Sequence, residues 1–327
     1  MAPKFSLARG SPRVPQVILP SQIYDNQSRS SPLHLSDSLI LRSNTAGTVN
    51  AAAMKNPMNQ DMEILEIKFE LSGALVDGND TTFGGSIWCD FSMGPIKLTN
   101  GAVPCFLFGR AENLTGEYKT DTTDTLGFNA YSWRLPRPLF VPAGTALIPN
   151  FTHTGFIPNT VNVRVGYSCR TVTKTPKRVC VPWIAKYVSK AFNPISTAAV
   201  DVSSELDLVN PHQDPVHLQR FVGRTLFLPN TGSTGSSEDR PNGFGSQYLT
   251  ARIMDSYGRP VVRNYTPFRT IFSAQTRSWE MGTGAILDPE AYYIVSLQKA
   301  AMTLTPDGVG QSFISLVGWR EMENSAL

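Results

Sequence analysis

The chain has 327 residues, of which 41% are hydrophobic and 17% are charged, and its formal net charge is +3 at pH 7. One hydrophobic core rarely serves so long a chain, so two domains are expected. The small net charge gives by itself no reason to expect nucleic-acid binding. No run of 18 apolar residues is present that could cross a membrane as a helix. The 25 glycines and 24 prolines suit many short strands joined by turns.

Residues 1–50 are predicted to form an extended N-terminal arm. They are rich in serine and proline, and their basic residues outnumber their acidic residues by three. The first residues lack the continuous apolar stretch of a secretion signal, so we expect a protein that is not secreted. Within the arm, the segment SLILRSN at residues 38–44 could add one edge strand.

Residues 51–170 are predicted to form the first of two β-rich units. In the segment EILEIKFEL, the apolar Ile67 and Phe69 alternate with charged neighbours. The segment VNVRVGY repeats this pattern with Val163 and Val165. Because successive side chains of a strand point to opposite faces, a period of two predicts strands with one buried face and one exposed face.

Residues 171–205 are predicted to link the two units. They carry the basic cluster TKTPKR and the only good helical pattern in the chain, PWIAKYVSKAF at residues 182–192. Pro182 suits the first turn of a helix, and Pro194 would stop it. The apolar residues that fall at helical spacing are Ile184, Tyr187, Val188 and Ala191. We therefore expect a short linker helix.

Residues 206–322 repeat the first unit, and residues 323–327 form a short polar tail. Five features recur in the same order, at offsets between 146 and 164 residues. The recurring pairs are Asn56 and Asn210, Gly94 and Gly258, Trp133 and Trp279, Pro142 and Pro289, and Gly166 and Gly318. Insertions in loops would explain the changing offset. The longest loops, 111–130 and 228–245, are predicted to contact other subunits or to decorate the outer surface.

Each copy is long enough for about eight short strands with their loops. Eight antiparallel strands in two packed sheets make a jelly roll. We therefore predict an all-β fold of two tandem eight-stranded jelly-roll barrels, a double jelly roll, with an extended N-terminal arm and a short linker helix. The predicted core residues are Ile67, Phe69, Val163 and Val165 in the first barrel, and Phe221, Val317 and Trp319 in the second.

One motif and the tandem architecture give the chain a resemblance to a known family. An Asn-Pro pair, four further residues and an apolar residue lead into the first long strand of each copy. The motif stands as Asn56-Pro57 with Met62, and as Asn210-Pro211 with Val216. Over about residues 55–322, the chain resembles the double jelly-roll major capsid proteins of icosahedral, often membrane-containing viruses, particularly the small phage members. It lacks the long tower insertions of the larger members.

The resemblance implies a major capsid protein with no enzymatic site and no cofactor. It implies trimeric, pseudo-hexagonal capsomers that self-assemble into an icosahedral shell, with the barrels upright and the protein located in the virion after assembly in the host cytoplasm. Implied partners are other copies of the chain, minor capsid or penton proteins, and an internal membrane or packaged genome on the inner face. A trimer also follows from shape, because three chains of two barrels supply the six corners of a hexagonal unit.

The residues themselves give no pattern typical of an enzyme, which would need clustered titratable groups. The histidines are His34, His153, His212 and His217, and none has the spacing of a metal-binding pair. The cysteines are Cys89, Cys105, Cys169 and Cys180, which we interpret as reduced, buried thiols. We predict no catalytic, cofactor-binding or metal site. Two alternatives stay open: a non-viral two-jelly-roll carbohydrate-binding protein or glycoconjugate hydrolase, and a viral spike or fibre head.

Six basic residues are candidates for the inner surface of a shell. They are Lys4, Arg9 and Arg13 in the arm, and Lys174, Lys177 and Arg178 in the linker. Their charges could face lipid head groups or genome phosphate. A solvated tail and linker is an equally open interpretation.

Overall fold

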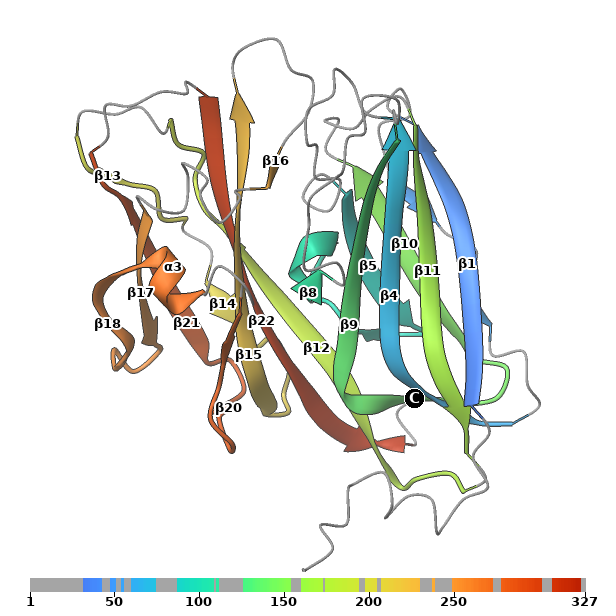
Figure 1. Ribbon diagram of the computed structural model, residues 1–327. Helices are drawn as coiled ribbons and strands as arrows, with labels where there is room; N and C mark the ends of the chain where they lie inside the picture. The colour runs from blue at the N-terminus through green and yellow to red at the C-terminus, as the bar shows by residue number, and fades with distance from the viewer. Residues whose placement is uncertain are drawn as a thin grey trace, which may run out of the picture.

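The structure is a computed structural model. It describes residues 32–42, 48–50, 54–55, 60–74, 87–108, 110–111, 126–153, 160–172, 174–193, 198–204, 207–229, 237–238, 249–272, 278–301 and 308–324. Nearly all elements in these ranges are strands, and they form two barrels side by side (Figure 1). No helix of the described ranges is long and apolar enough to cross a membrane.

The first barrel has the strands β1 (Pro32–Arg42), β2 (Thr48–Asn50), β3 (Met54–Lys55), β4 (Met62–Ala74), β5 (Ile87–Met93), β6 (Ile96–Lys97), β7 (Val103–Pro104), β8 (Arg110–Ala111), β9 (Leu126–Val141), β10 (Ala146–His153) and β11 (Thr160–Thr171). One sheet has the order β1-β11-β4-β9. The other has the order β2-β10-β5-β6, in which β3 also pairs with β10 and β7 also pairs with β5. In chain order these strands fill the eight jelly-roll positions, lettered B to I, with B, I, D and G in one sheet and C, H, E and F in the other.

The second barrel has the strands β12 (Arg178–Val188), β13 (Val200–Asp201), β14 (Leu208–Val209), β15 (Val216–Pro229), β16 (Ser237–Glu238), β17 (Leu249–Asp255), β18 (Pro260–Pro267), β19 (Ser278–Glu280), β20 (Ile286–Leu287), β21 (Tyr292–Lys299) and β22 (Gly308–Glu323). Its B, I and D strands are β12, β22 and β15, and β19 with β20 takes position G. The opposite sheet has the order β13-β21-β17-β18. The predicted double jelly roll is therefore confirmed in the strand order of both barrels.

Short helical turns follow the F strand in each barrel. They are η1 (Cys105–Leu107), a 3-10 helix, in the first barrel and α3 (Phe268–Ile271) in the second. Both turns connect F to G, and η1 lies on the side of the first barrel that faces the second barrel (Figure 1).

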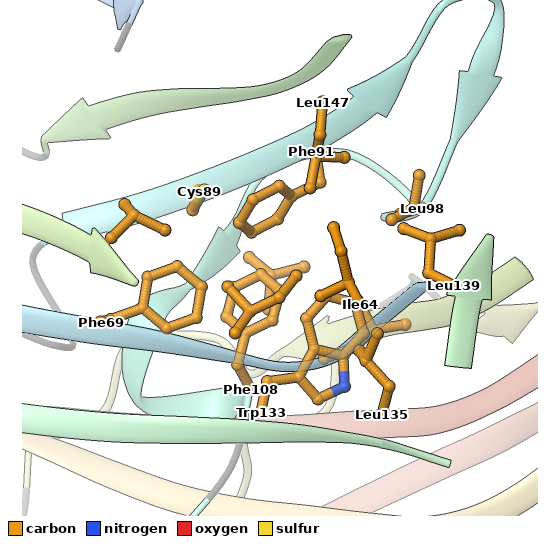
Figure 2. Packing of buried hydrophobic residues seen from close by; sticks show 14 of the residues in the cluster. Ile64, Phe69, Cys89, Phe91, Leu98, Phe108, Trp133, Leu135, Leu139 and Leu147 are labelled. Carbon is orange, nitrogen blue, oxygen red and sulfur yellow. The ribbon is translucent and has the colours of Figure 1, made fainter. Parts of the chain in front are cut away.

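The alternating pattern of β4 explains the core of the first barrel. Ile67 and Phe69 are fully buried, whereas the glutamates between the apolar residues remain partly exposed. Phe69 packs against Phe108 with ring centroids 5.0 Å apart, and Phe108 packs against Trp133 at the same distance (Figure 2). The predicted core residues Ile67, Phe69, Val163, Val165 and Phe221 are confirmed, since each is at most 1% exposed.

The predicted linker helix is wrong, because its first part belongs to strand β12. This strand pairs antiparallel with β22 along its whole length. Trp183 and Tyr187 pack in the core of the second barrel, whereas Ile184 packs against the first barrel. A strand that is buried on both faces loses its polar-apolar alternation, so its apolar residues can match helical spacing by chance.

Four strands, β1, β2, β12 and β13, fall in segments that the sequence assigned to the arm or the linker. Strand β1 lies in the predicted arm, where the segment 38–44 was expected to add an edge strand, and it pairs with β11. Strand β12 lies in the predicted linker. The division of the chain into domains otherwise stays a prediction.

Matching β-bulges place the two copies in register. The pairing of β4 with β11 skips Leu65, and the pairing of β15 with β22 skips Gln219, which follows Leu65 by 154 residues. This is also the offset from Asn56, which lies outside the described residues, to Asn210. Glu66 therefore corresponds to Arg220, and the other positions of the two D strands follow.

The alignment of Gly166 with Gly318 is wrong by three residues. Glu66 pairs with Ser168 and its counterpart Arg220 pairs with Val317, so Ser168 corresponds to Val317. An odd shift exchanges the two faces of a strand. Val317 is fully buried as predicted, but it packs against the first barrel.

Trp319, on the same face as Val317, was predicted in the core and is only partly buried. Its ring stacks on His217, with centroids 5.1 Å apart. The Arg137 guanidinium of the first barrel lies 5.7 Å from the centre of the same ring. Trp319 therefore lies where the two barrels meet.

Candidate functional site: the seam between the barrels

The two barrels meet along a contact that we call the seam. Strand β12 crosses between them (Figure 1). It pairs with β22 on one side and, through the single parallel pair Cys180 and Leu139, with β9 on the other. The B-I-D-G sheets of the two barrels are therefore joined into one sheet.

Backbone hydrogen bonds fix β12 against the F side of the first barrel. The amide of Ile184 donates to the carbonyl of Leu98 at 3.1 Å, and the amide of Asn100 donates to the carbonyl of Ile184 at 2.8 Å. The Lys186 ammonium donates to the carbonyl of Ala102 and lies 4.7 Å from the centre of the Trp88 ring. Burial lowers the pKa of Lys186, and the nearby Asp90 opposes this shift.

Apolar side chains of the second barrel complete the core of the first. Phe313 lies with its ring 5.5 Å from that of Phe106 and 6.2 Å from that of Trp88, centroid to centroid. Val222 and Val317 belong to the same buried cluster. Burying a side chain of this size typically contributes about 1.5–3 kcal/mol, so these contacts hold the barrels together firmly.

Polar groups of the second barrel satisfy the carbonyl oxygens of η1. The Ser315 hydroxyl donates to the Leu107 carbonyl at 3.1 Å, and the Arg220 guanidinium donates to the Phe108 carbonyl at 3.5 Å. Burial lowers the pKa of Arg220, and Glu280 opposes this shift. The buried Arg224 places its guanidinium 5.7 Å from the centre of the Phe106 ring. The seam is thus packed and hydrogen-bonded like a protein interior.

The corresponding face of the first barrel is charged and at least partly exposed. We call it the charged face, and it comprises Glu66, Lys68, Glu70, Arg164 and Ser168. Arg164 pairs with Glu70 at 3.2 Å, and their side chains are 65% and 41% exposed. Lys68 lies 3.8 Å from Glu66, which also accepts a hydrogen bond from Ser132. The same strand positions carry three apolar side chains and two buried or partly buried arginines where they meet the other barrel, and charged or polar side chains where they do not.

The predicted inner-surface residues are only partly described. Lys174, Lys177 and Arg178 lie together before and at the start of β12 and are exposed. Arg178 lies 3.6 Å from Glu321 and 3.8 Å from Glu323, so part of its charge is balanced. Lys4, Arg9 and Arg13 lie outside the described residues, as does most of the loops 111–130 and 228–245.

The described histidines have structural surroundings. Burial lowers the pKa of His212 to about 4, helped by the positive charge of Arg320 and opposed by Asp214. His217 stacks on Trp319. The side chains of His34 and His153 lie outside what the structure describes. Within the described ranges, no three histidine, cysteine or acidic side chains are grouped so that they could hold a metal ion.

The four cysteines are free thiols, and three of them are buried. Cys180 is only partly buried, so the expectation of four buried thiols is wrong for this one. Burial raises the pKa of every one of them, to about 12 for Cys169. A raised pKa lowers the fraction of reactive thiolate at neutral pH, as is typical of structural cysteines.

Asn210, of the Asn-Pro motif, has a structural role. Its side chain is fully buried. The amide nitrogen donates to the carbonyls of Asp214, Leu287 and Asp288 at 3.0–3.1 Å, and the amide oxygen accepts from the backbone of His212 at 3.0 Å. The motif thus ties the loop before the D strand to the turn before the H strand.

Sequence reasoning missed the seam as a site. One signal could have found it: β22 and β12 carry apolar residues on both faces, which in a half-exposed barrel predicts a second contact. A strand with one solvent-exposed face would show alternating polar and apolar residues, as β4 does.

Comparisons with known proteins yield likenesses of structure only. No family model matches the chain, and no curated protein sequence matches it. The structure is similar to the major capsid protein P2 of bacteriophage PM2, at 8% identity and a TM-score of 0.38, over 88% of this chain and 98% of that one. It is similar to the mavirus major capsid protein at 9% and 0.37, over 99% and 92%. It is also similar to a chain of the Sputnik virophage at 9% and 0.40, over 89% and 86%.

Proposed function

We propose that the chain is the major capsid protein of an icosahedral virus, and that it assembles as trimeric, pseudo-hexagonal capsomers. In this proposal the protein is a building block and not an enzyme, and its place is the virion. Its partners are further copies of itself, together with minor or penton proteins.

The seam is the observation that carries this proposal. Backbone bonds, buried aromatic rings and a shared sheet hold the barrels in one fixed relation. A fixed pair of similar barrels supplies two adjacent corners of a hexagonal outline, and three chains around a threefold axis supply six. A buried core that two barrels share suits a subunit of a shell, because such a subunit needs a constant shape more than a ligand-binding pocket.

The oligomeric state of the purified full-length chain tests the proposal. We expect mass photometry and light scattering to give a trimer of the 35.8 kDa chain at micromolar concentration. Negative-stain microscopy should then show hexagonal particles and, at higher concentration, shell fragments. A stable monomer that binds glycans on an array would contradict the proposal and support the carbohydrate-binding alternative.

We further propose that the basic residues of the arm and linker face the inside of the shell. Deletion of residues 1–20 removes Lys4, Arg9 and Arg13 but no described strand. We expect this variant to fold, with an unchanged circular dichroism spectrum, and to form at least several-fold fewer complete shells. The reversals Lys174→Glu and Lys177→Glu test the linker part. Normal shell yield from both variants would show that these charges have no anchoring role.

A further inference from the structure

The seam inside the chain indicates where the next chain docks, an inference that rests on the trimer proposed above. In a closed ring of three chains, each second barrel meets the first barrel of the next chain. The seam joins the F strand and η1 of the first barrel to the outer face of β12, β22 and β15. The counterparts of these two surfaces are β18 with α3 and the charged face, and within the described ranges neither of them packs against another barrel of the same chain.

The connections η1 and α3 occupy equivalent positions in the two barrels and have similar backbone geometry. Each follows a proline, Pro104 or Pro267, that lies 163 residues from its counterpart and shares its backbone angles, with φ −53° in both and ψ 133° or 130°. Three residues before each proline stands a residue with left-handed backbone, Gly101 at φ 75° and Asn264 at φ 52°. The position of α3 on the second barrel therefore matches that of η1 on the first.

This correspondence places Arg269 where the seam has Phe106. Both residues are the second of their helical turn. In the seam, Phe106 lies beside the guanidinium of Arg224. The D-strand register makes Glu70 the counterpart of Arg224, because both follow their bulges by five residues. In a contact of the same geometry between two chains, Arg269 and Glu70 would take the places that Phe106 and Arg224 have in the seam.

We propose that α3 and β18 of one chain dock on the charged face of a second copy, with Arg269 paired to Glu70. The positive charge of the docking element can meet the glutamates of the charged face. The charged residues of β18 and α3 are Arg263 and Arg269, whereas the charged face presents Glu66 and Glu70 beside Lys68 and Arg164. Tyr265 on β18 is 44% exposed, as suits an aromatic side chain that a partner covers.

Strand edges support the same arrangement. At the seam, β12 hydrogen-bonds to residues 98–100 of the first barrel. The counterparts of these two segments are β1 and β18, and each stands at the end of its sheet in the described strand order. An edge strand presents unpaired amide and carbonyl groups that can bond to another chain.

The contact between chains differs from the seam in being polar at its centre. Phe313 and Val222 of the seam correspond to Arg164 and Lys68 of the charged face. Such a contact is weakened by salt, whereas an apolar one is not. We expect trimers to dissociate at high ionic strength while the two barrels of each chain stay joined.

Charge reversal tests the pairing in the full-length chain. Glu70→Arg and Arg269→Glu should each raise the trimer dissociation constant at least about tenfold, since like charges across an interface are strongly unfavourable. The double variant restores opposite charges and should return to within about threefold of the natural chain. Mass photometry across a dilution series measures all four proteins. The matched control is Glu323→Arg, which reverses an exposed charge away from the two surfaces.

A cysteine pair gives a second, independent measurement. Glu70→Cys together with Arg269→Cys should give covalent dimers and trimers with a short bismaleimide, and neither single variant should. A natural chain that is monomeric would contradict the proposed function itself. A trimer that neither reversal weakens and that the cysteine pair does not link would overturn only the docking surface proposed here.

Discussion

The amide of Asn210 joins two separate stretches of backbone in the second barrel, residues 210–214 and residues 287–288. It holds the carbonyls of Leu287 and Asp288, which lie far away in the chain, and that of the nearby Asp214. The hydrogen bond to Leu287 is buried and the other two are partly buried, so the Asn210 side chain and the Leu287 carbonyl in particular need hydrogen-bond partners. The hydrogen-bonding geometry therefore accounts for an asparagine at this position.

We expect Asn210→Ala to lower the free energy of unfolding by about 3 kcal/mol, because it takes this donor from one buried and two partly buried carbonyls. Urea denaturation followed by tryptophan fluorescence measures the change. Asn324→Ala, which removes an amide near the end of the described chain, should cost less than about 0.5 kcal/mol. Equal costs for the two variants would show that the Asn210 network adds nothing specific.

His212 makes the stability of the protein depend on pH. Its pKa is about 4 in the folded chain and rises to the usual 6.5 on unfolding. The unfolded chain therefore binds the proton more tightly. Stability is complete above about pH 6.5 and falls as the pH drops toward 4.

We expect His212→Gln to remove this dependence. The natural chain should lose about 1–2 kcal/mol between pH 7 and pH 4.5 through this residue, a value reduced for its partial exposure. Urea midpoints at the two pH values, compared with those of the variant, give the difference. An identical acid slope in both proteins would mean that other groups carry the whole effect.

At the scale of elements, a glycine in the D strand β15 makes room for the end of α3. The ring of Phe272, which ends α3, occupies the space where a side chain of Gly223 would begin. The absence of a Cβ on β15 thus lets the turn lie close to its own barrel. The same turn carries Arg269 toward the surface proposed to meet a second chain.

We expect Gly223→Ala to destabilise the second barrel by about 1–3 kcal/mol, because the ring must move. Phe272→Leu in the same chain should recover part of the loss. Gly282→Ala is the control, since a Cβ there meets nothing within 4 Å. Thermal unfolding of the three variants decides the point, and an unchanged midpoint for Gly223→Ala would be inconsistent with the close contact.

The sequence predicted those elements whose two faces differ. The alternation in β4 and β11 identified their core residues correctly, because one face of each strand is buried and the other is at least partly exposed to solvent. Strands β12 and β22 were misassigned in type or phase, because both of their faces are buried. A glycine match then fixed the wrong register for β22, where only the pairing partners reveal the three-residue shift. The seam followed from neither pattern, since it depends on contacts between distant segments.

At the scale of the whole molecule, the seam should make the barrels unfold as one. Phe313 lies on the second barrel yet belongs to the buried cluster of the first. Removing it leaves a cavity bounded by both barrels. The first barrel then loses part of its core, and the second barrel loses a contact that joins it to the first.

We expect Phe313→Ala to cost about 3–5 kcal/mol and to lower the unfolding midpoint of the whole chain. Calorimetry of the natural chain should give one cooperative transition. Ile286→Ala, at a position 47% exposed, should leave the midpoint nearly unchanged. Two separate transitions in the natural chain, only one of them shifted by Phe313→Ala, would contradict a shared core.

The fixed seam also has a consequence of parity. Because β12 and β22 bind the barrels into an inseparable pair, any closed ring of whole chains contains an even number of barrels. A ring of six is open to this chain and a ring of five is not. A closed shell built from the proposed capsomers must therefore fill its fivefold positions with a different polypeptide. The ratio of that polypeptide to this chain in a finished particle would then depend on the number of fivefold vertices.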